Sequence, residues 1–275
     1  MMLRFDIVGD IAIIRNTTDN LTVVAESILQ KNKRVKVVLA QSGPVQGIFR
    51  LCKLRHVAGE ERTTTAHREN GCLFHVDLAA VHFSPRLVHE RRLVAESVGP
   101  AESVLNMFGG VGTFSVEIAR KNPSTRVFNV DVNAEAIRLC LRNILANRLR
   151  GRVVAVLADA KEAANSLFLN KMDRVLLPLP EKSREYLDIA VSTLRREGVI
   201  HYYDFIDADK QESPLEKALT KISSTIDGKN VSSRGRRIVK SVAPRRYLVS
   251  LELHKNRQVL DFAESSLASS SKRIP

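Results

Sequence analysis

The sequence predicts an α/β protein: a doubly wound, mostly parallel sheet of the Rossmann type, preceded by a small mixed α/β module. Three observations support this. From about residue 76, short β-rich runs alternate with longer helical patterns, as in β-α-β repeats around a parallel sheet. A glycine cluster stands in the first β-α turn, and an acidic residue closes each of the next two strands. The preceding stretch holds several strand patterns and one helical pattern.

The small module is expected to span residues 1–75. Residues 6–14 have the pattern of a strand, a glycine turn and a second strand. Residues 21–31 carry apolar side chains at helical spacing. Two further strand patterns cover residues 36–40 and 48–54, the second because polar and apolar residues alternate in it. Together these patterns predict a mixed α/β or β-barrel-like module.

The larger domain is expected to span residues 76–257. Five strand patterns are separated by helical ones, at residues 103–108, 125–131, 153–159, 173–177 and 198–203. The helix before the fifth strand is predicted over residues 183–196. The Ser-rich tail, residues 258–275, has no core periodicity, so we expect it to be flexible.

Charge restricts the class of protein. Lys and Arg number 43 against 30 acidic residues, which gives a net charge of +13 and a pI near 10.0. Nine of these cations and one acid lie between Lys229 and Arg257. Such a concentration is typical of a surface that binds phosphates, and a generally basic surface is the alternative. Aromatic residues make up only 5%, so folded RNA is a better expectation than a stacking platform for single strands.

Several classes of protein are excluded. No apolar run approaches the roughly 20 residues of a membrane span, and the N-terminus lacks the apolar region of a signal peptide. The three cysteines, Cys52, Cys72 and Cys140, include no Cys-x-x-Cys pair, which argues against a disulfide scaffold or a zinc ribbon. We therefore expect a cytoplasmic protein without membrane association or a metal site.

The cluster Gly109-Gly110-Val111-Gly112 predicts a nucleoside-binding turn, with a ligand-free tight turn as the alternative. Asp131 closes the next strand, where a carboxylate reaches a ribose diol. The last glycine comes too early for the dinucleotide fingerprint, and no Gly-Lys-Ser/Thr follows. A cofactor without a pyrophosphate fits better, and S-adenosylmethionine is the common one. Asp159 would then face the adenine amino group, unless it only caps a helix.

The fourth strand ends in Leu177-Pro178-Leu179-Pro180, at the edge where ligands bind such sheets. The prolines restrict the backbone and leave main-chain carbonyls as contacts for a base edge; a plain strand-ending turn is the alternative. The residues expected to bind the cofactor are Phe108, Gly109, Gly110, Val111, Gly112, Asp131, Val132, Asp159, Ala160 and Pro178.

Several stretches resemble archaeal and eukaryotic tRNA (guanine-N1)-methyltransferases of the Trm5 family, which modify guanosine 37 beside the anticodon. The similarity runs from about residue 5 to residue 255. The stretches that carry it are His75–Asp77, Val81–Arg86 with Glu90-Arg91, Met107–Phe114, Asp173–Pro180, Gly198–Tyr203 and Arg237–Arg245.

This resemblance implies a tRNA methyltransferase that uses S-adenosylmethionine, with a first module that positions the RNA. It implies that Glu90 accepts the N1 proton of guanine and that Arg50 lies near O6. No protein partner is evident, so a monomer is expected. The residues expected to contact tRNA, from the resemblance and from the basic segment, are His82, Arg86, Arg91, Leu179, Pro180, Tyr203, Arg236, Arg237, Lys240 and Arg245.

Three residues depart from the family pattern. Asn106 stands where an acid usually ends the first strand, His82 replaces a Tyr, and Pro178 replaces an Asn. The last two are target-side positions, so a wyosine precursor at tRNA position 37 is the alternative substrate, for methyl or aminocarboxypropyl transfer. A protein that only binds tRNA conflicts with the intact glycine loop. For Glu90 the alternative is a surface ion pair with Arg86, and for His82 it is core packing.

Overall fold

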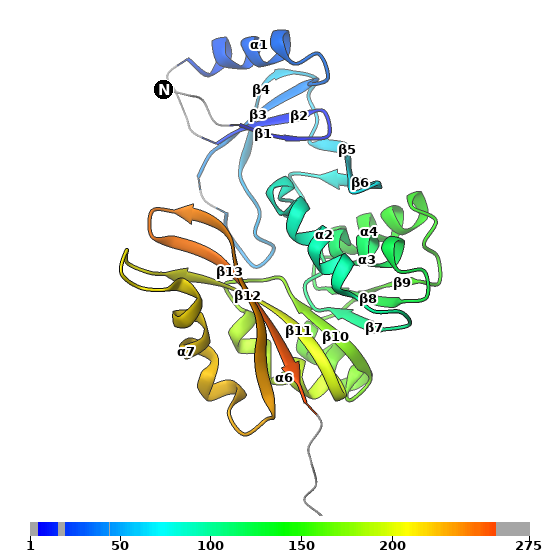
Figure 1. The fold of residues 1–275 in the computed structure, drawn as a ribbon. Coiled ribbons are helices and arrows are strands. Elements are labelled where there is room, and N and C mark those ends of the chain that lie inside the picture. The colour runs from blue at the N-terminus through cyan, green and yellow to red at the C-terminus, as the bar shows by residue number, and fades with distance from the viewer. Residues whose placement is uncertain (1–4, 16–19, 44, 257–275) are drawn as a thin grey trace, which may run out of the picture.

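The computed structural model describes residues 5–15, 20–43 and 45–256. The tail expected to be flexible, residues 258–275, lies outside them. Figure 1 shows a small N-terminal sheet above a larger domain, with a long loop reaching down from the first to the second. The order of these two parts along the chain agrees with the sequence prediction.

The N-terminal module is a four-stranded mixed sheet covered by one helix. Its elements are β1 (Phe5–Val8), β2 (Ile11–Ile14), α1 (Leu21–Lys31), β3 (Val37–Gln41) and β4 (Leu54–Gly59). The sheet order is β1-β2-β3-β4, and only β2 and β3 are parallel. The helix buries Leu21, Ala25 and Ile28 in a core shared with Ile14 and Val38. The module is therefore an open sheet with a helical cover.

The strand predicted over residues 48–54 was wrong. In the structure β4 begins only at Leu54, and the residues before it form a loop closed by a bridge between Gln46 and Leu51. The apolar residues Ile48 and Phe49 line a cavity of the larger domain. The apolar side chains of this stretch therefore belong to the cavity wall and not to a sheet, and the sequence pattern alone does not distinguish the two.

A hairpin that was not predicted from the sequence is formed by β5 (Thr64–Glu69) and β6 (Cys72–Asp77). Its turn is Asn70-Gly71, with φ angles of 46° and 75°. Asn-Gly between two extended runs is the strongest short-range hairpin signal, because both residues tolerate positive φ. This dipeptide could therefore have located the hairpin.

The hairpin docks on the larger domain through side-chain amides. Asn143 Oδ1 accepts from the His75 N–H at 2.7 Å, and Asn147 Oδ1 accepts from the Leu73 N–H at 2.9 Å. Both Asn residues lie on α4 (Ala134–Ala146) or at its C-terminal cap. The expected domain boundary at residue 75 thus falls inside β6.

The larger domain is built on a seven-stranded sheet in the order β12-β13-β11-β10-β7-β8-β9, and all its strands except β13 are parallel. These strands are β7 (Ser103–Asn106), β8 (Arg126–Asp131), β9 (Val153–Leu157), β10 (Met172–Leu177), β11 (Leu194–Asp207), β12 (Val231–Ala243) and β13 (Arg246–Lys255). The doubly wound, mostly parallel sheet predicted from the sequence is confirmed.

Helices cover both faces of this sheet (Figure 1). On one face, α2 (Val88–Ser97), α3 (Thr113–Lys121) and α4 contribute Val94, Val116 and Ile144 to one core. On the other, Ala163, Ala190 and Ile222 pack in a second core. They belong to α5 (Ala160–Ala163), α6 (Leu187–Thr193) and α7 (Pro214–Ile226). Short helical turns at Pro85–Leu87, Ala164–Phe168 and Ser183–Tyr186 complete the connections.

Two details of this domain differ from the prediction. The helix expected over residues 183–196 ends at Thr193, and β11 begins at Leu194. The basic segment after residue 229, which had no predicted secondary structure, forms the β12–β13 pair. In the described part of the chain, no helix is long and apolar enough to cross a bilayer. No cluster of metal-ligating side chains occurs among the described residues either.

Candidate active site

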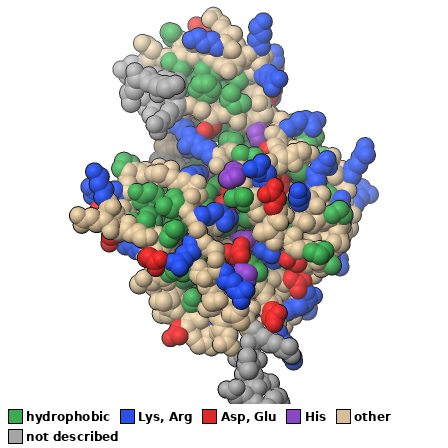
Figure 2. Space-filling view, viewed as in Figure 1, with side chains coloured by type: hydrophobic (Ala, Val, Ile, Leu, Met, Phe, Trp, Pro, Cys, Tyr) green, Lys and Arg blue, Asp and Glu red, His purple; other side chains and the backbone are tan. Residues whose placement is uncertain are grey.

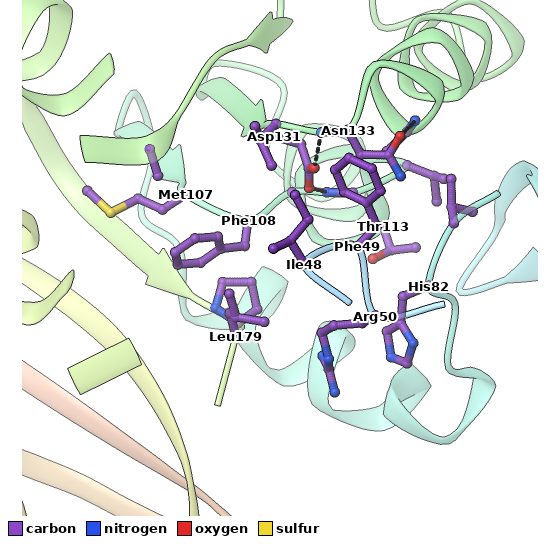
Figure 3. Close-up of a pocket in the computed structure, with 18 of the residues that line it drawn as sticks. Ile48, Phe49, Arg50, His82, Met107, Phe108, Thr113, Asp131, Asn133 and Leu179 are labelled. Atoms are coloured by element: carbon purple, nitrogen blue, oxygen red, sulfur yellow. Dashed lines mark hydrogen bonds between the residues drawn. The ribbon is translucent and has the colours of Figure 1, made fainter. Parts of the chain in front are cut away.

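A cavity of about 480 Å³ opens at the carboxyl ends of β7, β8, β9 and β10. The chain runs from β7 to β8 and β9 on one side and returns to β10 on the other, so the strand order reverses here. Ligands of doubly wound sheets bind at such a point. The cavity volume lies within the roughly 300–1,000 Å³ of small-molecule sites. Figure 3 shows Ile48, Phe49 and Arg50, from the loop of the N-terminal module, around the same cavity as Phe108 and Asp131 of the larger domain.

The glycine loop brings backbone to the cavity wall. A Cβ on Gly109 would lie 2.1 Å from Asn129 Oδ1, and one on Gly112, whose φ is 87°, would lie 2.8 Å from Cys140 Sγ. These two glycines therefore permit tight packing of the loop. Gly110 differs, because no described atom lies within 4 Å of its Cβ position and it lines the cavity. The loop thus offers an open backbone cradle at Gly110.

Asp131 links this loop to the end of β8. Its Oδ2 accepts from the Gly110 N–H at 2.7 Å, and its Oδ1 accepts from the Asn133 N–H at 2.9 Å. Burial raises the pKa of the Asp131 carboxyl, and these N–H groups oppose that rise. An ionised carboxylate offers about four acceptor positions. About two remain for hydroxyl groups of a ligand.

Asp159 serves as a helix cap and also lines the cavity. Its Oδ1 accepts from the backbone N–H groups of Lys161 at 2.8 Å and Glu162 at 3.2 Å. The capping alternative is confirmed. The same geometry leaves Oδ2 outside the cap, so the predicted contact with an adenine amino group is compatible with it.

Several cavity residues were missed by the sequence analysis. Tyr186 packs edge-to-face on Phe108, with 4.8 Å between ring centroids, and Lys161 Nζ lies 4.8 Å from the Tyr186 ring centre. Thr113 and Asn133 also line the cavity. Tyr186 lies outside every motif of the sequence, so only the tertiary structure identifies it. Of the predicted cofactor residues, all but Gly112 line the cavity: Phe108, Gly109, Gly110, Val111, Asp131, Val132, Asp159, Ala160 and Pro178.

The loop from the N-terminal module supplies Arg50. Its φ is 56°, a left-handed conformation that costs a non-glycine residue about 1–2 kcal/mol. Its Nη2 lies 3.0 Å from Glu181 Oε1, and its buried Nε has no hydrogen-bond partner among the described residues. The loop therefore presents a constrained cation, with an unused donor, at the mouth of the cavity.

A second cavity, of about 540 Å³, adjoins the first. Arg50, His82 and Pro178 line both cavities, and Glu90 lines the second. A planar ring bound in the second cavity would therefore lie next to a ligand bound in the first cavity. The structure brings the two predicted catalytic residues, Arg50 and Glu90, to the wall of this same cavity.

Glu90 is not a surface residue, so its predicted alternative, an ion pair with Arg86, is wrong. The side chain is 3% exposed, and it accepts hydrogen bonds from Tyr203 and Arg237. Arg86 instead donates to Asp6 at 2.8 Å. The reason is that Glu90 lies on the face of α2 that packs towards β11 and β12.

His82 lies between the two cavities and is half-buried. Burial, together with the nearby cations Arg50 and Lys240, lowers the pKa of its imidazole to about 3. The ring is therefore neutral near pH 7. The ring lines both cavities, so stacking on the target base stays a prediction, with core packing as its alternative.

Three residues predicted to contact tRNA form hydrogen bonds or ion pairs with other residues of the protein. Arg91 is 2% exposed and pairs with Glu69 at 2.6 Å and with Glu117 at 3.3 Å. Tyr203 is 3% exposed, and its hydroxyl donates to Glu90. The guanidinium of Arg237 is likewise directed at Glu90. Arg91 and Tyr203 are too deeply buried for a contact with the RNA backbone, but Arg91 lines the first cavity and Tyr203 the second, so their contact with the substrate stays a prediction.

Most of the other predicted tRNA contacts are exposed or half-buried, although Pro180 is buried. Leu179 lines the first cavity, while Pro180 and Lys240 line the second. Burial lowers the pKa of the Lys240 ammonium, and the cations Arg86 and Arg15 lower it further. Two more form exposed ion pairs, Arg236 with Glu216 and Arg245 with Asp209. The structure therefore leaves these contacts available to RNA.

Comparisons with known proteins agree with this geometry. The model of the TRM5/TYW2 methyltransferase domain matches residues 65–232. The tRNA (guanine(37)-N(1))-methyltransferase Trm5b of Pyrococcus abyssi is 36% identical over 253 residues, which are 90% of this chain and 73% of that protein. The tRNA 4-demethylwyosine(37)-methyltransferase Taw21 of Saccharolobus solfataricus is 32% identical over 257 residues, which cover 92% of this chain and 94% of that protein.

A solved structure shows the same fold. The complex of aTrm5 and tRNALeu superposes with a TM-score of 0.80 at 32% sequence identity. The similarity covers 93% of this chain and 72% of that one. The family model spans more than half of the chain, and the glycine loop, Asp131 and Asp159 lie within the matched range. The chain therefore belongs to the TRM5/TYW2 methyltransferase family.

Proposed function

We propose that this protein is a tRNA methyltransferase that transfers a methyl group from S-adenosylmethionine to N1 of guanosine 37. The observation that carries the proposal is the pair of adjoining cavities. The first has the glycine cradle and carboxylates of a nucleoside site, and the second holds Glu90. Arg50, at the wall of both, can contact a base whose reacting atom faces the cofactor.

The residues of the first cavity fit S-adenosylmethionine. Asp131 has free acceptor positions for the ribose hydroxyls, and Gly110 presents open backbone. Asp159 and Tyr186 would border the adenine. When bound, this cofactor supplies an electrophilic methyl group on sulfur.

The residues of the second cavity fit the chemistry of guanine N1. This atom is a poor nucleophile until its lactam proton leaves. In this proposal the Glu90 carboxylate receives that proton, and Arg50 stabilises the negative charge that develops on O6. Neutral His82 can stack on the base without adding charge to it.

Mass spectrometry of nucleosides tests this function. tRNA with guanosine at position 37 would be incubated with the protein and S-adenosylmethionine. We expect 1-methylguanosine at position 37 and none in a tRNA that carries adenosine there. Absence of 1-methylguanosine, or methylation at another position, would contradict the proposal.

A second candidate is methylation of 4-demethylwyosine at the same position. Two observations favour it. The similarity to Taw21 covers 94% of that protein, and Pro178 offers no side-chain amide to a guanine edge. The same assay on tRNA that carries 4-demethylwyosine distinguishes the substrates, and an aminocarboxypropyl product would show itself by its larger mass increase. That the protein is a cytoplasmic monomer remains a proposal.

Asp131→Ala is expected to weaken binding of S-adenosylmethionine. The variant loses a charged acceptor for the ribose, a contact worth about 1.5–3 kcal/mol, or about 10- to 150-fold in affinity. It also loses the bonds to the Gly110 and Asn133 N–H groups. Calorimetry measures the affinity, and Asp173→Ala, at the opposite end of the parallel strands, is the control. Unchanged affinity in Asp131→Ala would remove this residue from the site.

Replacing Arg236 and Arg245 with Ala is expected to reduce the salt dependence of tRNA binding. Each lost phosphate contact lowers the slope of log K against log salt by about 0.7–0.9. The exposed ion pairs of both residues contribute about 0–1 kcal/mol each, so the melting temperature should change little. Arg195→Ala is the control, because Arg195 also pairs with an Asp but lies at the far end of the sheet. An unaltered slope would show that this strand pair does not contact RNA.

A further inference from the structure

Glu90 on α2 is held by two residues from distant parts of the sequence. Its Oε1 accepts from the Tyr203 hydroxyl on β11 at 2.6 Å. Its Oε2 accepts from Arg237 Nε on β12 at 2.9 Å, and Arg237 Nη2 also donates to Oε1. One helix and two strands thus converge on a single carboxylate.

The direction of Arg237 follows from the alternation of side chains along β12. Arg236, the preceding residue, projects to the other face and pairs with Glu216 on α7. Arg237 projects towards α2, and its side chain is only 32% exposed. Its hydrogen bonds are therefore made inward, to Glu90, although the sequence places it in the most basic segment of the chain.

The Glu90 carboxylate can accept one more hydrogen bond. An ionised carboxylate has about four acceptor positions. The Tyr203 hydroxyl and the two Arg237 nitrogens use three of them. One position remains, which suffices for a substrate N–H that enters from the second cavity.

We propose that Arg237 and Tyr203 are positioning residues that hold the Glu90 carboxylate in place and fix the orientation of its free lone pair. This rests on the proposed function, in which Glu90 receives the N1 proton. Without a cation, a buried carboxylate favours its protonated form, which cannot accept a proton. Burial, and next the charge of Glu90, raise the pKa of Tyr203 far above its ordinary value, so its hydroxyl stays a donor.

Other charged groups also face this cluster. On the cavity side these are Arg15, Arg50, Lys240, Arg246 and Glu181, with His82 and Cys52. On the sheet side they are Glu252 and His201. Burial lowers the pKa of both His82 and His201 below the neutral range and raises that of Cys52. Burial also raises the pKa of the Asp131 carboxyl in the first cavity, so the Glu90 cluster is identified by the change that a variant causes in the acidic limb of the pH–rate profile, and not by the limb itself.

Single-turnover methylation of tRNA by Arg237→Met, measured against pH, tests the inference. Loss of a cation next to a carboxylate shifts titration by about 1–3 pH units, so we expect the acidic limb to move up by about that much. Arg237→Lys should restore part of the shift, and Tyr203→Phe, which is nearly isosteric, should show a smaller shift in the same direction. The salt slope of tRNA binding should stay that of the wild type.

The matched control is Arg62→Met. Arg62 forms a two-point ion pair with Asp10, at 2.6 and 3.0 Å, and lines neither cavity. Its loss should lower the melting temperature without moving the pH profile. The inference is overturned if Arg237→Met has the same pH–rate profile as the wild type. A reduced salt dependence of tRNA binding in that variant would then indicate that Arg237 contacts RNA.

A second measurement does not depend on activity. Carboxyl ¹³C NMR should show that Glu90 is protonated at a higher pH in Arg237→Met and Tyr203→Phe than in the wild type. If the wild type makes no methylated nucleoside, the proposed function fails, whereas an unmoved Glu90 signal overturns the present inference. The two failures are therefore distinguishable.

Discussion

Glu90→Gln should reduce single-turnover methylation by about 10²- to 10⁴-fold, the usual effect of losing a general base. The amide has the same shape but cannot accept a proton from N1 of guanine. Part of the loss should be recovered at higher pH, because a larger fraction of the substrate is then already deprotonated. The rate is measured with saturating tRNA and S-adenosylmethionine, so that binding does not limit it.

This substitution also leaves Arg237 without its charged partner, so stability must be followed in parallel. Breaking a buried ion pair can cost about 3–5 kcal/mol, and the partial exposure of Arg237 should reduce that figure. Glu96→Gln is the matched control, because Glu96 lies exposed on the same helix. If Glu90→Gln melts like the wild type and methylates at the same rate, Glu90 has no part in the chemistry.

Arg50→Ala should lower the rate by about 10²- to 10³-fold, as does removal of one donor from an oxyanion site. The cation at the junction of the two cavities is lost, and with it the stabilisation of charge on O6. Alanine retains a Cβ, so the strain at a φ of 56° stays similar and the loop should be disturbed little. Arg50→Lys should recover only part of the rate, because an ammonium lacks the planar fork of the guanidinium.

Two controls separate chemistry from loop position. Arg55→Ala removes an exposed cation of β4 and should leave the rate unchanged. Glu181→Gln releases the Arg50 side chain, and its ion pair, partly exposed on both sides, is worth about 0–1 kcal/mol. A small effect of Glu181→Gln beside a large effect of Arg50→Ala would assign the loss to Arg50 itself. A rate loss in Arg50→Ala matched by an equal loss of tRNA affinity would contradict a role in the chemistry.

Local sequence alone determined the parts of this protein that depend on neighbours along the chain. The glycine loop at Gly109 and the carboxylate at Asp131 follow consecutive strands of a parallel sheet, so their meeting at one edge was predictable. The Asn70-Gly71 hairpin could also have been predicted from local sequence, although it was missed. The loop at residues 48–50 could not, because its apolar side chains resemble those of a strand until the cavity that they line is known.

Only the tertiary structure decided which charged side chains line the cavities and which form buried ion pairs. Glu90 lies 113 residues from Tyr203 and 147 residues from Arg237 along the chain, yet the three side chains form one hydrogen-bonded cluster. Arg91 looks like Arg86 in the sequence, but it is buried between two carboxylates while Arg86 remains at the surface. A pattern of charges gives their number and spacing. The strength of the interaction between two charged side chains depends on their burial. That burial arises only when the α2 helix and the β11 and β12 strands pack together.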